Sequence, residues 1–178
     1  MYQSTIAKEV KFEGIGLHTG VYTKVKIIPA ESNMGIVFKY LHNKGNYEIR
    51  ADIDQVVGTK RGTTLGLSNE KIYTVEHILS ALYGMKIDNA IIKIDNIELP
   101  ILDGSTYEYV KKIKEVGIKK LNDKRNYLII KDKMEVSQGN STLTILPYNG
   151  FKISYSLDYN NKSIGKQNFI LESLDNYK

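Results

Sequence analysis

Hydrophobic residues near the middle of the chain recur at helical spacing over residues 74–85. They follow the i, i+3, i+4, i+7 pattern of an amphipathic helix. The positions with this spacing are Val75, Ile78, Leu79 and Leu82. Thr74 precedes them, and its hydroxyl could accept a hydrogen bond from an amide of the first turn. The pattern therefore predicts a helix here, with Thr74 as its N-cap.

A second helix is predicted after residue 105. Ser105 and Glu108 have the spacing of a capping box, in which each side chain bonds an amide at the helix start. Gly117 is a natural stop, because glycine adopts the left-handed conformation that ends many helices. The predicted core face consists of Tyr109, Val110, Ile113 and Val116.

Alternating or continuous apolar runs predict strands in the remainder of the first 120 residues. These runs cover residues 6–12, 21–28, 35–41, 48–56 and 90–94. The glycine-rich segment 14–20 lies between the first two runs, where we expect a tight hairpin turn. Pro29 ends the second run.

The polar, charged segment 121–126 is the predicted domain boundary, giving a first domain of residues 1–121 and a second of 122–178. Four strand patterns follow this segment, at residues 127–136, 141–146, 151–159 and 167–171. Four strands without a covering helix leave one face of a sheet bare. We therefore expect the second domain to be incomplete.

Composition narrows the classes of protein that this chain could belong to. Hydrophobic residues make up 42% and charged residues 25%, as in ordinary globular proteins. The absence of cysteine excludes disulfides and thiolate metal sites. The net charge is +5, but the lysines are scattered, so most should be solvated. No apolar run approaches the ~18 residues of a membrane span, and the start does not resemble a signal peptide, so we expect a cytoplasmic protein.

Glu76 and His77 are the strongest candidates for chemistry. In the first turn of the predicted helix, the helix dipole favours an ionised carboxylate and a neutral imidazole. Such a pair suits metal-assisted hydrolysis, in which the imidazole ligates and the carboxylate takes a proton. The alternative is structural, since a single histidine near a helix start is more often only hydrogen-bonded. Tyr73 and Ala81 stand four residues on either side of His77, so this is not a two-histidine zincin helix.

Three further positions are candidates that also have ordinary explanations. His18 lies in the glycine-rich segment and could be either a site residue or a loop histidine. The polar segment 58–66 could face a substrate or be a surface turn. Asp103 could orient a metal-bound imidazole, although aspartate before glycine is commonly a turn residue.

Six segments in order resemble one protein family, the UDP-3-O-acyl-N-acetylglucosamine deacetylases, which are the zinc amidases of lipid A synthesis. They are Gly-Ile-Gly-Leu-His-Thr-Gly at 14–20, Arg-Gly-Thr-Thr-Leu at 61–65, Thr-Val-Glu-His at 74–77, Asp-Asn at 88–89, Pro-Ile-Leu-Asp-Gly-Ser at 100–105 and Pro-Tyr-Asn-Gly at 147–150. The resemblance covers the N-terminal part of the family. It implies an α+β fold with two similar domains, each a two-layer sandwich of a sheet with two helices on one face, and an active site between them.

The resemblance also implies roles for individual residues. It makes His77 a zinc ligand and Glu76 the general base. It places His18 near the site and the loop of Arg61, Gly62 and Thr63 beside the substrate. In the second domain, Asp158 and Tyr159 would meet the UDP group, where a tyrosine ring can stack on uracil.

The implied reaction is hydrolysis of the N-acetyl group of UDP-3-O-acyl-N-acetylglucosamine by a monomeric, zinc-dependent enzyme. Zinc would polarise the carbonyl and acidify a water, from which the glutamate would take a proton. The family's other two zinc ligands lie in a His-Lys-x-x-Asp motif, and its oxyanion-stabilising threonine lies in an Ala-Arg-Thr-Phe segment. These 178 residues contain neither, so we expect this stretch alone to be inactive.

The alternative function is a non-catalytic RNA- or nucleotide-binding module with a two-layer fold like that of some ribosomal proteins. The charge of +5 permits contact with RNA. The sequence lacks an aromatic-basic strand motif and a phosphate-binding loop, so we expect no nucleic-acid partner.

Overall fold

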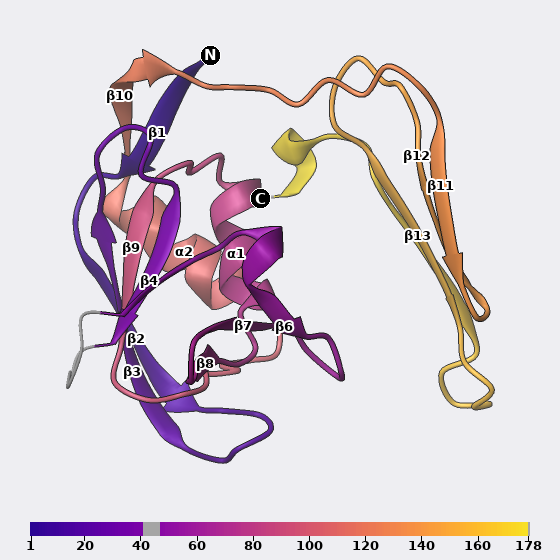
Figure 1. The fold of residues 1–178 in the computed structure, drawn as a ribbon, viewed down its shortest axis with the longest axis horizontal. Coiled ribbons are helices and arrows are strands. Elements are labelled where there is room, and N and C mark those ends of the chain that lie inside the picture. Colours follow the sequence, from indigo (N-terminus) through magenta and orange to yellow (C-terminus); the bar gives the residue numbers. More distant parts are fainter. Residues whose placement is uncertain (41–46, 178) are drawn as a thin grey trace. The chain divides into compact units, whose positions relative to one another are not determined.

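The computed structural model describes residues 1–40 and 47–177 and divides the chain into two compact units. The first unit is Met1–Arg125 and the second is Asn126–Lys178 (Figure 1). The predicted end of one strand, at Leu41, lies outside the described residues. Within the described ranges, no helix is both long enough and apolar enough to cross a membrane.

A five-stranded sheet forms one layer of the first unit, in the order β2-β3-β9-β4-β5. These strands are β2 (Val10–Ile15), β3 (Tyr22–Pro29), β4 (Ile36–Tyr40), β5 (Glu48–Arg50) and β9 (Ala90–Ile94). The β4–β9 pair is parallel and the other pairs are antiparallel. The hairpin predicted at residues 14–20 is confirmed, because it joins the antiparallel strands β2 and β3.

Two helices cover one face of this sheet, α1 (Glu76–Gly84) and α2 (Tyr107–Val116) (Figure 1). The predicted stripe of α1 packs into the core, where Ile78 and Leu82 are buried. From α2, the buried Tyr109 ring contacts Phe12 of β2, with 4.7 Å between the ring centroids. This arrangement confirms the expected α+β fold, with a sheet and two helices on one of its faces.

The predicted side-chain caps of both helices are wrong. Val75 is the N-cap of α1 and makes no side-chain capping bond. The Thr74 hydroxyl is turned into the interior, where it donates to Glu98 instead. The N-cap of α2 is Thr106, while Ser105 Oγ accepts from the amide of Tyr107 at 3.0 Å.

The predicted end of α2 is confirmed. Gly117 has a φ of 82°, and its amide donates to Ile113 O at 3.0 Å. A left-handed residue of this kind turns the chain out of the helix, and glycine adopts that conformation without a steric penalty.

Two small sheets complete the first unit. One pairs β1 (Tyr2–Ile6) with β10 (Ile118–Lys124), and the other has the order β6-β7-β8. The bounds of the latter are β6 (Val56–Gly58), β7 (Thr64–Leu67) and β8 (Glu70–Ile72). A single strand over residues 6–12 is therefore wrong: the chain leaves one sheet after Ile6 and joins another at Val10.

The strand predicted over residues 48–56 is also interrupted. A short 3-10 helix, η1 (Ile53–Gln55), separates β5 from β6. Asp52 caps this turn, because its carboxylate accepts from the amide of Asp54 at 3.3 Å. Local hydrogen bonding by an aspartate side chain offers the backbone an alternative to a sheet ladder.

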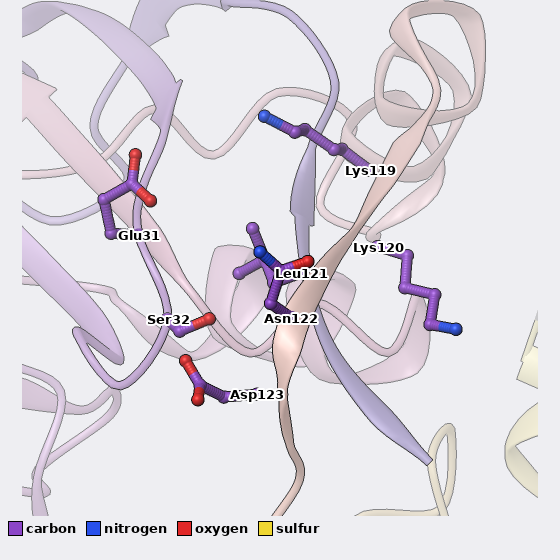
Figure 2. A pocket seen from close by; sticks show the side chains of 7 residues that line it. All are labelled: Glu31, Ser32, Lys119, Lys120, Leu121, Asn122 and Asp123. Carbon is purple, nitrogen blue, oxygen red and sulfur yellow. The ribbon is translucent and has the colours of Figure 1, made fainter.

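The charged segment predicted as a domain boundary is partly a strand. Residues 122–124 continue β10, and Arg125 is held by Asp88, with Nε 2.7 Å from Oδ1. Figure 2 shows an open pocket beside this strand, lined by Glu31, Ser32 and residues 119–123. None of the candidate site residues lines it.

The second unit contains two antiparallel hairpins, β11–β12 and β13–β14. Their strands are β11 (Met134–Gln138), β12 (Ser141–Ile145), β13 (Ile153–Asp158) and β14 (Lys166–Leu171). The first predicted strand is too long, since residues 127–133 are irregular. In the part of this unit that the structure describes, the only helical element is the 3-10 turn η2 (Leu174–Tyr177).

Candidate active site

Four segments of the first unit carry the candidate residues. His18 lies in the β2–β3 loop, and Arg61, Gly62 and Thr63 lie between β6 and β7. Glu76 and His77 begin α1, and Asp103 lies in the turn that precedes α2. Hydrogen bonds link the segment of Arg61, Gly62 and Thr63 to His18 and to the start of α1.

The Glu76 carboxylate is held by the loop between β6 and β7. The amide of Thr63 donates to Glu76 Oε2 at 2.9 Å. The carbonyl of the same residue accepts from the amide of Val75 at 3.2 Å. Thr63 therefore bonds both the backbone before the helix and the first side chain within it, which fixes the orientation of the half-buried carboxylate.

Gly62 separates Glu76 from His18. A Cβ at position 62 would stand 3.2 Å from Glu76 Oε1 and 3.5 Å from His18 Nε2. The His18 Nε2 lies 2.9 Å from the carbonyl oxygen of Arg61. Because a carbonyl only accepts, this geometry requires the hydrogen to be on Nε2. The structure thus brings the candidate base, the loop histidine and the Arg-Gly-Thr segment together.

His77 is half-buried in the first turn of α1 and interacts electrostatically with Asp103. Hydrogen bonds from the amide and hydroxyl of Ser105, at 3.0 and 2.8 Å, lower the pKa of Asp103, and an electrostatic interaction with His77 contributes in the same direction. Asp103 is exposed and caps its own turn. The turn interpretation of Asp103 is confirmed, and its role in orienting a metal-bound imidazole stays a prediction.

Sequence reasoning missed Glu98, which is completely buried. Its carboxylate accepts from the amide of His18 at 3.0 Å, from the amide and hydroxyl of Thr19 at 2.7 and 2.6 Å, and from the hydroxyl of Thr74 at 2.8 Å. Burial opposes ionisation, but the bonds from Thr19, His18 and Thr74 outweigh it and hold the pKa of Glu98 below its ordinary value.

The sequence does contain a signal for Glu98. It stands directly before Leu99, Pro100 and Ile101, which form an apolar run. An acid next to such a run is either solvated at an edge or buried with hydrogen-bond partners. Here the Glu98 carboxylate is buried together with its neighbours Leu99 and Pro100.

Asp158 and Tyr159 belong to the second unit. Asp158 ends β13, where it pairs with Lys166, and the amide of Tyr159 donates to Gly165 O at 3.1 Å. The Tyr159 side chain is exposed. The hydrogen bonds described above for Glu76 and His18 come from residues of the first unit.

The described residues do not form a complete metal site. Across residues 1–40 and 47–177, no three His, Asp or Glu side chains are grouped so that they could hold a metal ion. Catalytic zinc usually takes three protein ligands, and His77 offers one imidazole. The residues present therefore fit one ligand position of such a site and do not supply the others.

Comparisons with known proteins all point to the same protein family. A family model described as UDP-3-O-acyl N-acetylglycosamine deacetylase matches residues 3–178. A curated UDP-3-O-acyl-N-acetylglucosamine deacetylase of Syntrophus aciditrophicus is 37% identical over 174 residues, which cover 98% of this chain and 55% of the relative. Proteins of the same name from Helicobacter pylori and Lawsonia intracellularis are 40% identical over 167 residues and 36% identical over 172. These matches cover 94% and 97% of this chain and 56% and 57% of the relatives, so the chain spans a little over half of their length.

Proposed function

Because this chain belongs to the UDP-3-O-acyl-N-acetylglucosamine deacetylase family, we propose that it supplies the general base and one metal ligand of a lipid A deacetylase. The reaction is hydrolysis of the N-acetyl group of UDP-3-O-acyl-N-acetylglucosamine. The observation that carries the proposal is the contact set around Glu76, which unites three of the motifs that define the resemblance.

Glu76 is the proton acceptor in this proposal. Its Oε2 is occupied by the amide of Thr63, whereas Oε1 is the oxygen nearer to where a Cβ of Gly62 would stand. A general base must reach its proton within about 2.6–3.2 Å, so a carboxylate held in one orientation is an advantage. The absence of a side chain on Gly62 leaves room beside Oε1.

His77 is one ligand of a zinc ion. When bound, zinc supplies a Lewis acid for the carbonyl of the substrate amide. The remaining ligands belong to a His-Lys-x-x-Asp motif that these 178 residues lack, so the stretch alone is expected to be inactive. Asp103 would steady the His77 ring, in keeping with its electrostatic interaction with that residue.

The substrate is held by residues of both units. His18 and the loop of Arg61, Gly62 and Thr63 border the substrate. In support, Thr63 bonds the Glu76 carboxylate, and Gly62 lies beside both that carboxylate and His18 Nε2. Asp158 and Tyr159 meet the UDP group, and the exposed Tyr159 ring is free to stack on a base. The second unit is, in this proposal, part of a second domain of the same α+β kind.

Two substitutions in the full-length protein test the proposal. Glu76→Ala should lose most of kcat while the zinc content stays near one per chain, because only the base is removed. His77→Ala should lose the metal. Zinc can be measured by elemental analysis and turnover by release of acetate. An unchanged kcat in Glu76→Ala would remove Glu76 from the reaction.

A further inference from the structure

Glu98 is a buried carboxylate to which the proposed chemistry assigns no part. Its side chain is 0% exposed. Buried charges are normally compensated by a counter-ion or by several hydrogen bonds. Its carboxylate accepts from neutral donors on two separate segments, the β2–β3 loop and the residues directly before α1.

The first segment is the loop that carries His18. The amides of His18 and Thr19 both donate to the carboxylate, and Oε2 occupies the space in which Gly16 would carry a side chain. A Cβ on Gly16 would stand only 2.5 Å from that oxygen. The loop is therefore wrapped closely around Glu98, and the position of the His18 backbone depends on it.

The second segment is the backbone that leads into α1. Thr74 has a φ of 61°, a left-handed conformation that is unfavourable for a β-branched residue. The hydroxyl of Thr74 donates to Glu98 Oε1, and Tyr73 bonds the backbone on both sides of Glu98, at Ile97 O and Leu99 N. These bonds hold the unusual turn that directs the chain into the helix at Glu76.

We propose that Glu98 is a positioning residue that fixes His18 relative to Glu76 and His77. The carboxylate accepts from the His18 amide on one side and, on the other, from the side-chain hydroxyl of Thr74, two residues before Glu76. The His18 ring in turn bonds Arg61 O, next to Gly62, which lies beside the Glu76 carboxylate. This inference rests on the proposed function only where kcat is the readout.

Glutamine at position 98 would keep the shape but not the bonding. Amides of the protein donate to both carboxylate oxygens, from His18 to Oε1 and from Thr19 to Oε2. Glutamine has one oxygen and one NH2 group, so one of these N–H groups would face another donor. Aspartate would keep two accepting oxygens on a shorter side chain and should restore part of the positioning.

The test compares Glu98→Gln, Glu98→Asp and the control Glu9→Gln in the full-length protein. Glu9 is an acid of the same unit, paired with Lys11 and Lys26 at the surface. Per folded, zinc-loaded molecule, Glu98→Gln should lower kcat about tenfold to a hundredfold, as expected for a misplaced reacting group. KM should change much less, Glu98→Asp should recover part of kcat, and Glu9→Gln should match the unsubstituted protein.

A purely structural Glu98 would lower the melting temperature and leave kcat per folded molecule unchanged, and that result would overturn the proposal. If Glu98→Gln does not fold, Thr74→Val and Thr19→Val each remove one donor to the carboxylate. Both should then lower kcat several-fold, and normal kcat in both would equally overturn it.

An inactive unsubstituted protein would refute the proposed function and leave the positioning to be decided by NMR. In the folded protein, the His18 Nε2–H should be protected from exchange by its bond to Arg61 O. Glu98→Gln should remove that protection and shift the His18 ring resonances, whereas Glu9→Gln should not. Unchanged His18 resonances in Glu98→Gln would overturn the inference.

Discussion

The two units are built from similar strand patterns but differ in how much they bury. Among the described residues, every buried hydrophobic side chain except Leu171 belongs to the first unit. There, two helices cover a five-stranded sheet. In the second unit, two hairpins keep apolar side chains in water, including Val136, Leu143, Tyr155 and Phe169.

The difference explains where the candidate chemistry can be held in position. Glu76 and His18 are held by hydrogen bonds within the first unit, and His77 is half-buried at the start of α1. Asp158 and Tyr159 stand at the end of a hairpin strand and depend on a two-stranded ladder. The candidate residues with the most hydrogen-bond partners therefore lie in the unit that has the buried core, and the comparison can be tested by disturbing each unit in turn.

The largest expected difference is between the units as separate polypeptides. Residues 1–125 should fold and melt cooperatively, because they contain a covered core. Residues 126–178 alone should be largely unfolded, since isolated two-stranded hairpins are marginally stable in water. Circular dichroism melts of the two pieces, with the 178-residue chain as reference, would show this. A cooperative transition in the second piece would contradict the comparison.

A matched pair of phenylalanines gives the next largest effect. Phe38 of β4 is 0% exposed and Phe169 of β14 is 62% exposed. Phe38→Ala should destabilise the first unit by about 3–5 kcal/mol, because it leaves a cavity in a packed core. Phe169→Ala should change the free energy of unfolding by less than about 0.5 kcal/mol. Urea titrations followed by amide exchange would report the stability of each unit. Equal losses of stability in the two variants would contradict the difference in burial between the units.

Acid should destabilise the first unit through Glu98. Its folded-state pKa lies below the ordinary value of 4.5, so its ionised form stabilises the fold above about pH 4.5. That contribution is lost as the pH falls through the folded-state pKa. Glu98→Gln should cost about 1–3 kcal/mol at neutral pH and should flatten the stability curve below pH 4.5.

Glu135 of the second unit is the control for this pH dependence. Bonds from Thr144 and Lys133 lower its pKa, but its side chain is exposed. Glu135→Gln should leave the acid dependence of the first unit unchanged. Thermal melts between pH 3 and 7 would compare the three proteins, and a curve for Glu98→Gln that parallels the unsubstituted chain would remove Glu98 as its cause.

Ion pairs should give the smallest difference. Asp88 and Arg125 are 23% and 18% exposed, whereas Glu172 and Lys152 are 56% and 39% exposed. Asp88→Ala should cost about 1–3 kcal/mol, since it removes the carboxylate that pairs with a partly buried guanidinium and accepts from the Ser4 amide. Lys152→Ala should cost between 0 and about 1 kcal/mol. Chemical denaturation of both variants would measure the two costs, and a reversed order would contradict the difference in burial.

Local patterns were sufficient for most elements of the first unit. The spacing of Ile78 and Leu82 predicted a buried helix face, and Gly117 predicted the end of α2. The motif at residues 14–20 predicted a hairpin loop, and the six segments together indicated the family. Each of these inferences depends on residues close in sequence, or on a match of motifs, and so needs no knowledge of long-range contacts.

The errors have a common physical origin. Thr74 has the side chain of an N-cap, but a buried carboxylate 24 positions away binds its hydroxyl. Residues 6–12 alternate like one strand, but Ile6 pairs with Ile118 and Val10 with Ile27 in different sheets. In both cases the groups bond a partner that is distant in sequence, and the local pattern contains no information about that partner.

The sequence by itself determined the helices, the hairpin, the family and the residue types available for chemistry, because periodicity and motifs are properties of neighbouring positions. Tertiary structure alone decided which sheet each strand joins and what surrounds the candidate base. Glu98 shows the reason: its bond to His18 joins residues 80 positions apart. A buried carboxylate takes whichever donors the folded backbone presents, and only packing brings those donors to it.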